Sequence, residues 1–174
     1  RDSIYEATKL AKIDAETIIS EYAPGQYELT LKHQKSLLKA ADDILRLKRI
    51  IRAQARKHGV TACFMAKPME NISGSGMHFH ISLYDQKEKN IFAERNNEKV
   101  NKNLNYALGG LSKTMGESML IFAPNANSWR RFVSGSYAPT KPNWGIDNRS
   151  VAFRIPSSNK NNRRIEPVSY THLR

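Results

Sequence analysis

The chain has 174 residues and a formal net charge of +12, from 28 Lys and Arg against 16 Asp and Glu. Hydrophobic residues make up 40% and charged residues 25%, which is typical of a folded domain and not of a disordered or coiled-coil protein. No apolar run approaches the roughly 18 residues of a membrane helix. A single cysteine excludes an internal disulfide framework. We therefore expect a folded domain in a reducing, cytoplasmic setting, without a membrane partner. Because the chain opens on Arg1, we expect it to be part of a longer protein.

The elements expected in chain order are helices and strands that do not alternate regularly. Helices are expected over 2–13, 35–58 and 98–120, and strands over 27–31, 60–65, 77–84 and 150–155, with another strand from 163. Pro24-Gly25 marks a turn before the first strand. Because strands and helices mix without a one-to-one alternation, the expected fold class is α+β.

Three of these segments have a clear inner face. The apolar positions of the 98–120 helix recur at helical spacing and predict its buried side: Leu104, Ala107, Leu108, Leu111, Met115 and Met119. The 35–58 helix has a similar stripe that begins at Leu37 and Leu38. The 77–84 strand alternates strictly, which places Met77 and its alternate neighbours on one face and the polar residues on the other.

The polar face of the 77–84 strand is the first candidate site. His78, His80 and Ser82 project on one side of it, directly after a loop rich in glycine. Neutral imidazole is a common ligand of divalent metals. The alternative is two exposed histidines on the solvated face of a sheet, and the spacing alone favours that alternative.

Two glutamates that flank the Pro-Gly turn are the second candidate. Glu28 lies within an otherwise apolar strand, and Glu21 precedes the turn. A carboxylate in such a strand needs a partner, because burying a bare charge is costly. A hard cation such as Mg²⁺ or Mn²⁺ would serve, and a surface salt bridge is the alternative.

The basic C-terminal third is the third candidate. Residues 121–174 contain nine basic side chains against two acidic ones, which indicates an anionic partner or, alternatively, a solvated basic face. Arg149, Arg154 and Arg164 could bind phosphate oxygens through their guanidinium groups. Glu166, two positions after Arg164, fits a metal that bridges phosphates. No P-loop and no G-x-G-x-x-G is present, so any nucleotide would be bound by arginines and metal.

Together these residues resemble one family, the glutamine synthetase superfamily. The resemblance runs from about Glu21 to Glu166 and keeps the family order. The matching strings are Glu21 with Gly25-Gln26-Tyr27-Glu28, Lys67-Pro68-Met69, Gly74-Ser75-Gly76-Met77-His78-Phe79-His80, Asn127-Ser128-Trp129-Arg130-Arg131, Asn148-Arg149-Ser150, Arg154-Ile155-Pro156, and Arg163-Arg164-Ile165-Glu166. A single such string would be weak, whereas seven in order identify the family.

The resemblance implies part of the family's C-terminal catalytic domain, a curved antiparallel sheet with packed helices, over residues 1–166. It also implies an ATP-dependent ligase in which ATP phosphorylates the γ-carboxylate of glutamate and a nitrogen nucleophile attacks the acyl phosphate. The partners implied are glutamate, ATP, an amine and two Mg²⁺ or Mn²⁺ ions. Family members form rings, dodecamers in the bacterial type, and build each site between neighbouring subunits, so this chain alone is expected to be inactive.

Site roles are carried over by position. Glu21 and Glu28 would hold the first metal, and His78 and Glu166 the second. Gly74 and Arg131 would bind glutamate, and His80 and Ser82 would lie along the nucleotide. Arg149, Arg154 and Arg164 would hold the phosphates, and Arg149 is expected to be catalytic.

Three departures from the family pattern matter. The small N-terminal domain of the family, with further metal ligands, is expected upstream of these residues. The tail 167–174 matches nothing in the family, and Val168 occupies the position of a second glutamate-binding arginine. Tyr137 replaces the flap glutamate that receives ammonium in ammonia-using members, and we expect it to be part of the catalytic site.

The third departure indicates a subgroup. Ser136-Tyr137-Ala138-Pro139 and Trp144-Gly145-Ile146-Asp147-Asn148-Arg149 resemble the γ-glutamylpolyamine (γ-glutamylputrescine) synthetases, and an aromatic ring suits an amine with a carbon chain. Two alternatives stay open: an ordinary glutamate–ammonia ligase, and an inactive fragment that only binds metal or nucleotide. A nucleic-acid partner is not expected, because the basic residues lie within ligand motifs and not along one helix.

Overall fold

The computed structural model describes residues 1–94, 98–133 and 138–169. The chain divides into two compact units, residues 1–64 and residues 65–174. Both units contain helices and strands, and the order of elements is irregular. The α+β class is therefore confirmed. Among the described residues, no helix combines the length and the apolar character needed to cross a membrane.

The first unit is built around a β-hairpin. It contains α1 (Asp2–Leu10), β1 (Ala15–Ser20), β2 (Tyr27–Leu31) and α2 (Leu37–Lys57). The two strands pair antiparallel, with Ile19 opposite Glu28. The turn falls at Pro24-Gly25, as expected, and Gly25 adopts φ +72°, a conformation that glycine reaches without steric cost.

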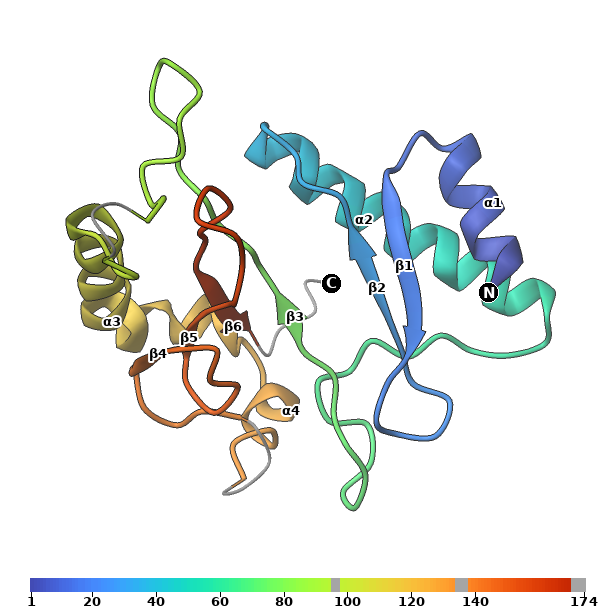
Figure 1. The fold of residues 1–174 in the computed structure, drawn as a ribbon. Helices are drawn as coiled ribbons and strands as arrows, with labels where there is room; N and C mark the ends of the chain where they lie inside the picture. Colours follow the sequence, from blue (N-terminus) through green and yellow to red (C-terminus); the bar gives the residue numbers. More distant parts are fainter. Residues whose placement is uncertain (95–97, 134–137, 170–174) are drawn as a thin grey trace. The chain divides into compact units, whose positions relative to one another are not determined.

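The two helices of this unit run antiparallel beside each other (Figure 1). At one end, Ser3 Oγ lies 3.2 Å from His58 Nε2, and towards the other end the Arg46 guanidinium donates to the Ala11 carbonyl at 2.8 Å. The helix α2 begins after Ser36, whose hydroxyl caps the Lys39 amide.

The expected inner stripe of α2 is wrong at its beginning. Leu37 and Leu38 are 82% and 80% exposed, whereas Asp43, Leu47 and Lys48 are buried. The apolar side chains of the first turn thus have little cover within this chain. The Asp43 carboxylate is balanced by Lys39 and Arg46 on the same helix, which makes its burial tolerable.

The second unit is a mixed four-stranded sheet covered on one face by a long helix. Its elements are β3 (Met77–His78), α3 (Lys102–Phe122), α4 (Ala126–Trp129), β4 (Trp144–Ile146), β5 (Phe153–Ile155) and β6 (Glu166–Ser169). The strand order is β3-β6-β5-β4. The strand β6 pairs antiparallel with both neighbours, as the family resemblance implied, whereas β4 pairs parallel with β5.

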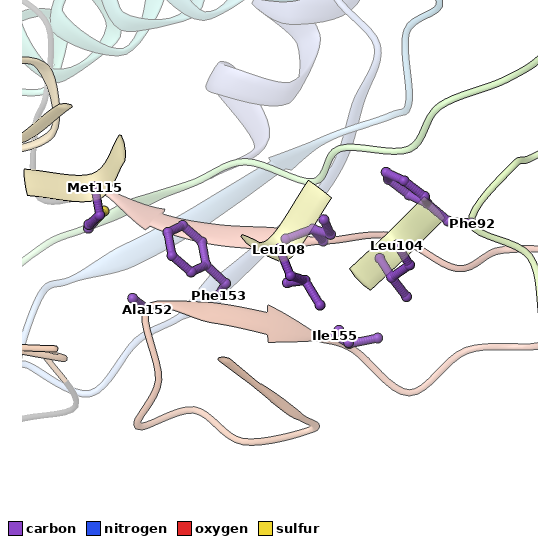
Figure 2. Close-up of a cluster of buried hydrophobic side chains, with 8 residues drawn as sticks. Phe92, Leu104, Leu108, Met115, Ala152, Phe153 and Ile155 are labelled. Atoms are coloured by element: carbon purple, nitrogen blue, oxygen red, sulfur yellow. The ribbon is translucent and has the colours of Figure 1, made fainter. Parts of the chain in front are cut away.

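The core of the second unit lies between α3 and the sheet (Figure 2). Leu104, Leu108 and Met115 of α3 are buried, and Ala107, Leu111 and Met119 pack against them, so the inner face expected for this helix is confirmed. Phe153 and Ile155 of β5 face them from the sheet. Burial of these side chains is the main stabilising contribution to the unit.

Several expected elements differ in the structure. The hairpin strand β1 and the short strand β4 were not expected, whereas residues 60–65, expected as a strand, form none. The Phe64 ring instead lies about 5 Å from the Lys48 and Arg52 side chains. The expected strand 77–84 is regular only at Met77–His78 and then continues as isolated bridges, the first of which pairs Ile81 with Ile165.

The core assignment predicts a difference between two identical substitutions on α3. Leu108→Ala should lower the free energy of unfolding by about 2–5 kcal/mol, because Leu108 is 0% exposed and its removal leaves a cavity. Leu120→Ala should change it by no more than about 0.5 kcal/mol, because Leu120 is 84% exposed. Urea denaturation followed by circular dichroism measures both values, and equal losses would contradict this core.

Candidate functional site

The centre of the candidate site is Glu166, on the middle strand of the second unit. The register of β6 against β5 pairs Glu166 with Arg154. On the other side, His78 pairs with Val168 and Ile81 with Ile165, so the same register places His80 opposite Glu166. Cross-strand neighbours share a face of the sheet, and three segments far apart in sequence therefore present polar side chains together.

The contacts of Glu166 follow this register. Its Oε1 lies 2.8 Å from His78 Nδ1, and its Oε2 accepts a hydrogen bond from Arg154 Nε at 2.8 Å. The His80 ring reaches within 3.8 Å of Oε2. The Glu166 side chain is only 2% exposed, whereas the two imidazoles are about half exposed. The arrangement is a buried carboxylate with nitrogen donors around it.

These contacts keep Glu166 ionised. Burial alone would raise the pKa of its carboxyl group, but hydrogen bonds from His78 and Arg154 and the electrostatic interactions with His80 and His78 lower it from 4.5 to about 2. Glu166 is therefore a carboxylate throughout the physiological pH range.

The imidazole of His80 is held in its neutral form. Burial lowers the pKa of His80, with Arg164 acting in the same direction and Glu166 opposing it. The Arg164 Nε donates to His80 Nδ1 at 3.0 Å, which requires an unprotonated ring nitrogen. The register places Ser82 opposite Arg164, so His80, Ser82 and Arg164 continue the polar face beside Glu166.

Gly74 and Arg131, both expected at the glutamate site, lie against each other. A Cβ at Gly74 would meet the Ala66 carbonyl oxygen at 2.3 Å and the Arg131 Cδ at 2.5 Å. Only glycine fits this position without displacing backbone or the arginine side chain. The structure thus brings a loop and an arginine, 57 positions apart in sequence, into direct packing.

Arg149 lies in an exposed turn between β4 and β5. The turn is closed by Asn148, whose side-chain oxygen accepts from the Ser150 amide at 2.8 Å. Asp147, just before it, has φ +51° and accepts a hydrogen bond from Ser157 Oγ at 3.0 Å. The hydrogen bonds from Ser157 lower the pKa of Asp147. These bonds tie the Arg149 turn to the segment that follows β5.

Glu21 and Glu28 lie in the first unit, on the hairpin. The Glu21 amide bonds to the Gln26 carbonyl, and Ile19 is opposite Glu28. This register places the two glutamates diagonally on one face, where a single cation could contact both. Their convergence with His78 and Glu166 stays a prediction, because those residues belong to the other unit.

Three further expectations concern metal ligands and the glutamate site. Among the described residues, no three His, Cys, Asp or Glu side chains gather into a ready metal cluster. Tyr137 lies outside the described residues. Val168, at the position of the second glutamate-binding arginine, is buried in a small cluster with Ala138 and Phe132. The start of the tail belongs to β6, which runs to Ser169.

Sequence reasoning missed the residues that hold β6 in place. Asn90 is buried, and its amide group donates to the carbonyls of Asn161 and Arg163 while its oxygen accepts from the Phe92 amide. Glu94 accepts from the buried Arg163 guanidinium at 3.1 Å. The Arg163-Arg164 pair contained a signal, because adjacent strand residues face opposite sides and one of two arginines had to meet a counter-charge in the interior.

The depressed pKa of Glu166 predicts a pH dependence of stability. Because its folded pKa lies below its ordinary value, its contribution is fully present above about pH 4.5 and is lost as the pH falls towards 2. Glu166→Gln should remove on the order of 2–3 kcal/mol of this change. Urea denaturation at pH values from 2 to 6 measures it, and parallel curves for both proteins would contradict the ionised state.

Comparison with known proteins places the chain in a family. The family model described as the catalytic domain of glutamine synthetase matches residues 1–169. γ-Glutamylputrescine synthetase of Escherichia coli is 43% identical over 165 residues, which are 95% of this chain and 35% of that protein. Glutamate–isopropylamine ligase of a Pseudomonas species is 40% identical over 157 residues, covering 90% of this chain and 34% of that protein.

Comparison with solved structures gives the same family. The cryo-electron microscopy structure of Plasmodium falciparum glutamine synthetase matches with a TM-score of 0.88 and 29% identity, over 95% of this chain and 32% of that chain. This chain therefore spans about a third of the length of these relatives. The family model and the fold agree, and the chain belongs to the glutamine synthetase catalytic-domain family.

Proposed function

We propose that the complete protein is an ATP-dependent ligase that joins the γ-carboxylate of glutamate to an amine. The observation that carries the proposal is the polar sheet face around Glu166, where Arg154, Arg164 and two imidazoles converge. Two relatives are named as a γ-glutamylputrescine synthetase and a glutamate–isopropylamine ligase, which supports an organic amine as the second substrate.

The reaction proceeds in two balanced steps. The γ-carboxylate oxygen of glutamate attacks the γ-phosphorus of ATP, forming γ-glutamyl phosphate and releasing ADP. The free amine nitrogen then attacks the acyl carbon, inorganic phosphate leaves, and the nitrogen loses a proton. Charge develops on phosphoryl oxygens in the first step and on the leaving phosphate in the second, so fixed cations nearby accelerate both.

Arginines and imidazoles of this chain are assigned to the nucleotide side. Arg154 and Arg164 bind phosphate oxygens, and the exposed Arg149 acts as the catalytic cation at the transferred group. The neutral ring of His80 and the hydroxyl of Ser82 line the nucleotide. A bonded pair of His80 and Arg164, at 3.0 Å, supports this assignment because it fixes the guanidinium plane beside the strand.

The residues present fit the divalent metals that the family implies. His78 Nδ1 lies 2.8 Å from Glu166 Oε1, and the two side chains offer nitrogen and oxygen ligands to one cation. Glu21 and Glu28 offer carboxylates to another. Mg²⁺ or Mn²⁺ at these positions would neutralise phosphate charge. Glutamate itself is assigned to the Gly74 backbone and to Arg131.

An ordinary glutamate–ammonia ligase is the second candidate. The observation in its favour is a Pyrococcus horikoshii relative, named glutamine synthetase, that is 38% identical over 151 residues. The residue that separates the two candidates is Tyr137, which cannot take a proton from ammonium at neutral pH as a carboxylate does. Its ring instead offers a surface for an alkyl chain or a cationic amine.

The choice of amine is tested in the complete protein. We expect kcat/KM for putrescine or a monoamine to exceed that for ammonia by about tenfold or more, and Tyr137→Glu to shift the ratio towards ammonia. Coupled measurement of ADP release with each amine gives both ratios. A parent that favours ammonia, with a ratio that the substitution leaves unchanged, would assign the protein to glutamine synthesis.

The assembly is part of the same proposal. We expect the complete protein to form a ring of identical subunits, a dodecamer if it follows the bacterial type, with each site shared between neighbours. The 174-residue chain alone should then show no turnover with glutamate, ATP, Mg²⁺ and putrescine, because it lacks the residues that a neighbour supplies. Release of ADP that depends on the amine, from the purified chain at its monomeric mass, would contradict a shared site.

A further inference from the structure

The loop that carries Gly74 is closed at its base and braced from within. The Ser75 amide donates to the Ala66 carbonyl at 2.8 Å, which joins the two ends of the loop. Inside it, Lys67 Nζ donates to the Ile72 carbonyl at 2.6 Å. Residues 66–75 therefore form one hydrogen-bonded unit, and its position depends on how its base is held.

Asn127 holds that base by a two-point contact. The Lys67 amide donates to Asn127 Oδ1 at 2.8 Å, and Asn127 Nδ2 donates to the Lys67 carbonyl at 2.7 Å. The carboxamide thus pairs with both backbone groups of one residue, as a neighbouring β-strand would. Such a contact fixes position and orientation together, because displacement in either direction breaks one of the two bonds.

The same short helix also positions Arg131. The helix α4 is capped by Asn125, whose oxygen accepts from the amide and the hydroxyl of the buried Ser128. One helical turn after Asn127, Arg131 donates its amide to the Ser128 carbonyl at 3.1 Å. Asn127 contacts the base of the loop at Lys67 and Arg131 lies against Gly74, so both residues face the same loop.

We propose that Asn127 is a positioning residue for the glutamate site, which sets the Gly74 loop at the correct distance from Arg131. The inference rests on the proposed function, in which Gly74 and Arg131 bind glutamate. The clearance at Gly74 supports it, because an added Cβ would lie 2.5 Å from Arg131 Cδ and 2.3 Å from the Ala66 oxygen. A loop packed this closely cannot shift towards the arginine, and Asn127 prevents it from shifting away.

The test is a set of variants in the complete protein, assayed with glutamate and ATP varied separately. Asn127→Ala should raise KM for glutamate by about tenfold or more and leave KM for ATP within about twofold, because only the glutamate side loses its alignment. Asn127→Asp, which keeps the acceptor for the Lys67 amide and loses the donor, should give an intermediate KM for glutamate. Asn105→Ala is the matched control, since it makes the same substitution at an exposed position of α3 and should leave both KM values within about twofold.

Amide hydrogen exchange at Ser75 provides a readout that does not depend on activity. Asn127→Ala should accelerate this exchange by about tenfold or more relative to Asn105→Ala, because the Ser75–Ala66 bond loses its anchor. Unchanged exchange overturns the positioning role, even in a protein that proves to have no ligase activity and so refutes the proposed function. Equal rises in the two KM values, or faster exchange with an unchanged KM for glutamate, would make Asn127 a structural residue only.

Discussion

The second unit depends on the contacts that the buried Glu166 carboxylate makes with His78 and Arg154. An ionised carboxylate with 2% exposure is stable only if donors surround it, and those donors come from both neighbouring strands. A register slip of one residue would turn Glu166 towards α3 and Ile165 towards the polar face, at a cost to both. The contacts with His78 and Arg154 therefore select one register. The groups proposed to bind metal and phosphate are the same groups that specify the strand pairing.

The opposite face of the sheet imposes the complementary constraint. Phe153, Ile155 and Ile165 alternate with Arg154, Arg164 and Glu166 along β5 and the segment entering β6, and the apolar set packs against α3 (Figure 2). Period-two alternation separates the two sets without any further device. Asn90 and Glu94 then secure the turn before β6 from the core side, by bonds to the Arg163 carbonyl and guanidinium. The site is thus a consequence of core packing as much as of its own contacts.

The sequence was sufficient to predict which side chains share a face wherever the pattern lay within one helix or strand. Helical spacing identified the buried side of α3, and the alternation from Met77 placed His78 and His80 on one face, as their shared contact with Glu166 confirms. The pairing of strands that are distant in sequence could not be predicted from such local patterns. The short strands β1 and β4 show little alternation in sequence and are defined by their pairing with β2 and β5. The apolar run 60–65 has a strand-like composition but no strand partner among the described residues. The roles proposed for the site residues came from the family resemblance, because periodicity cannot assign them.

The charge distribution favours a compact phosphate ligand over an extended polyanion. Two cations of the second unit converge on one sheet face: Arg154 on β5, and Arg164 in the segment entering β6, lie beside a single buried anion, Glu166. A nucleic-acid backbone is better matched by cations spread along a groove or a helix. Convergence within a few side chains suits a group that carries several negative oxygens on one phosphorus. Because Arg154 is already ordered by Glu166, little conformational entropy remains to be lost when such a group binds, and the buried carboxylate preorganises the cation beside it.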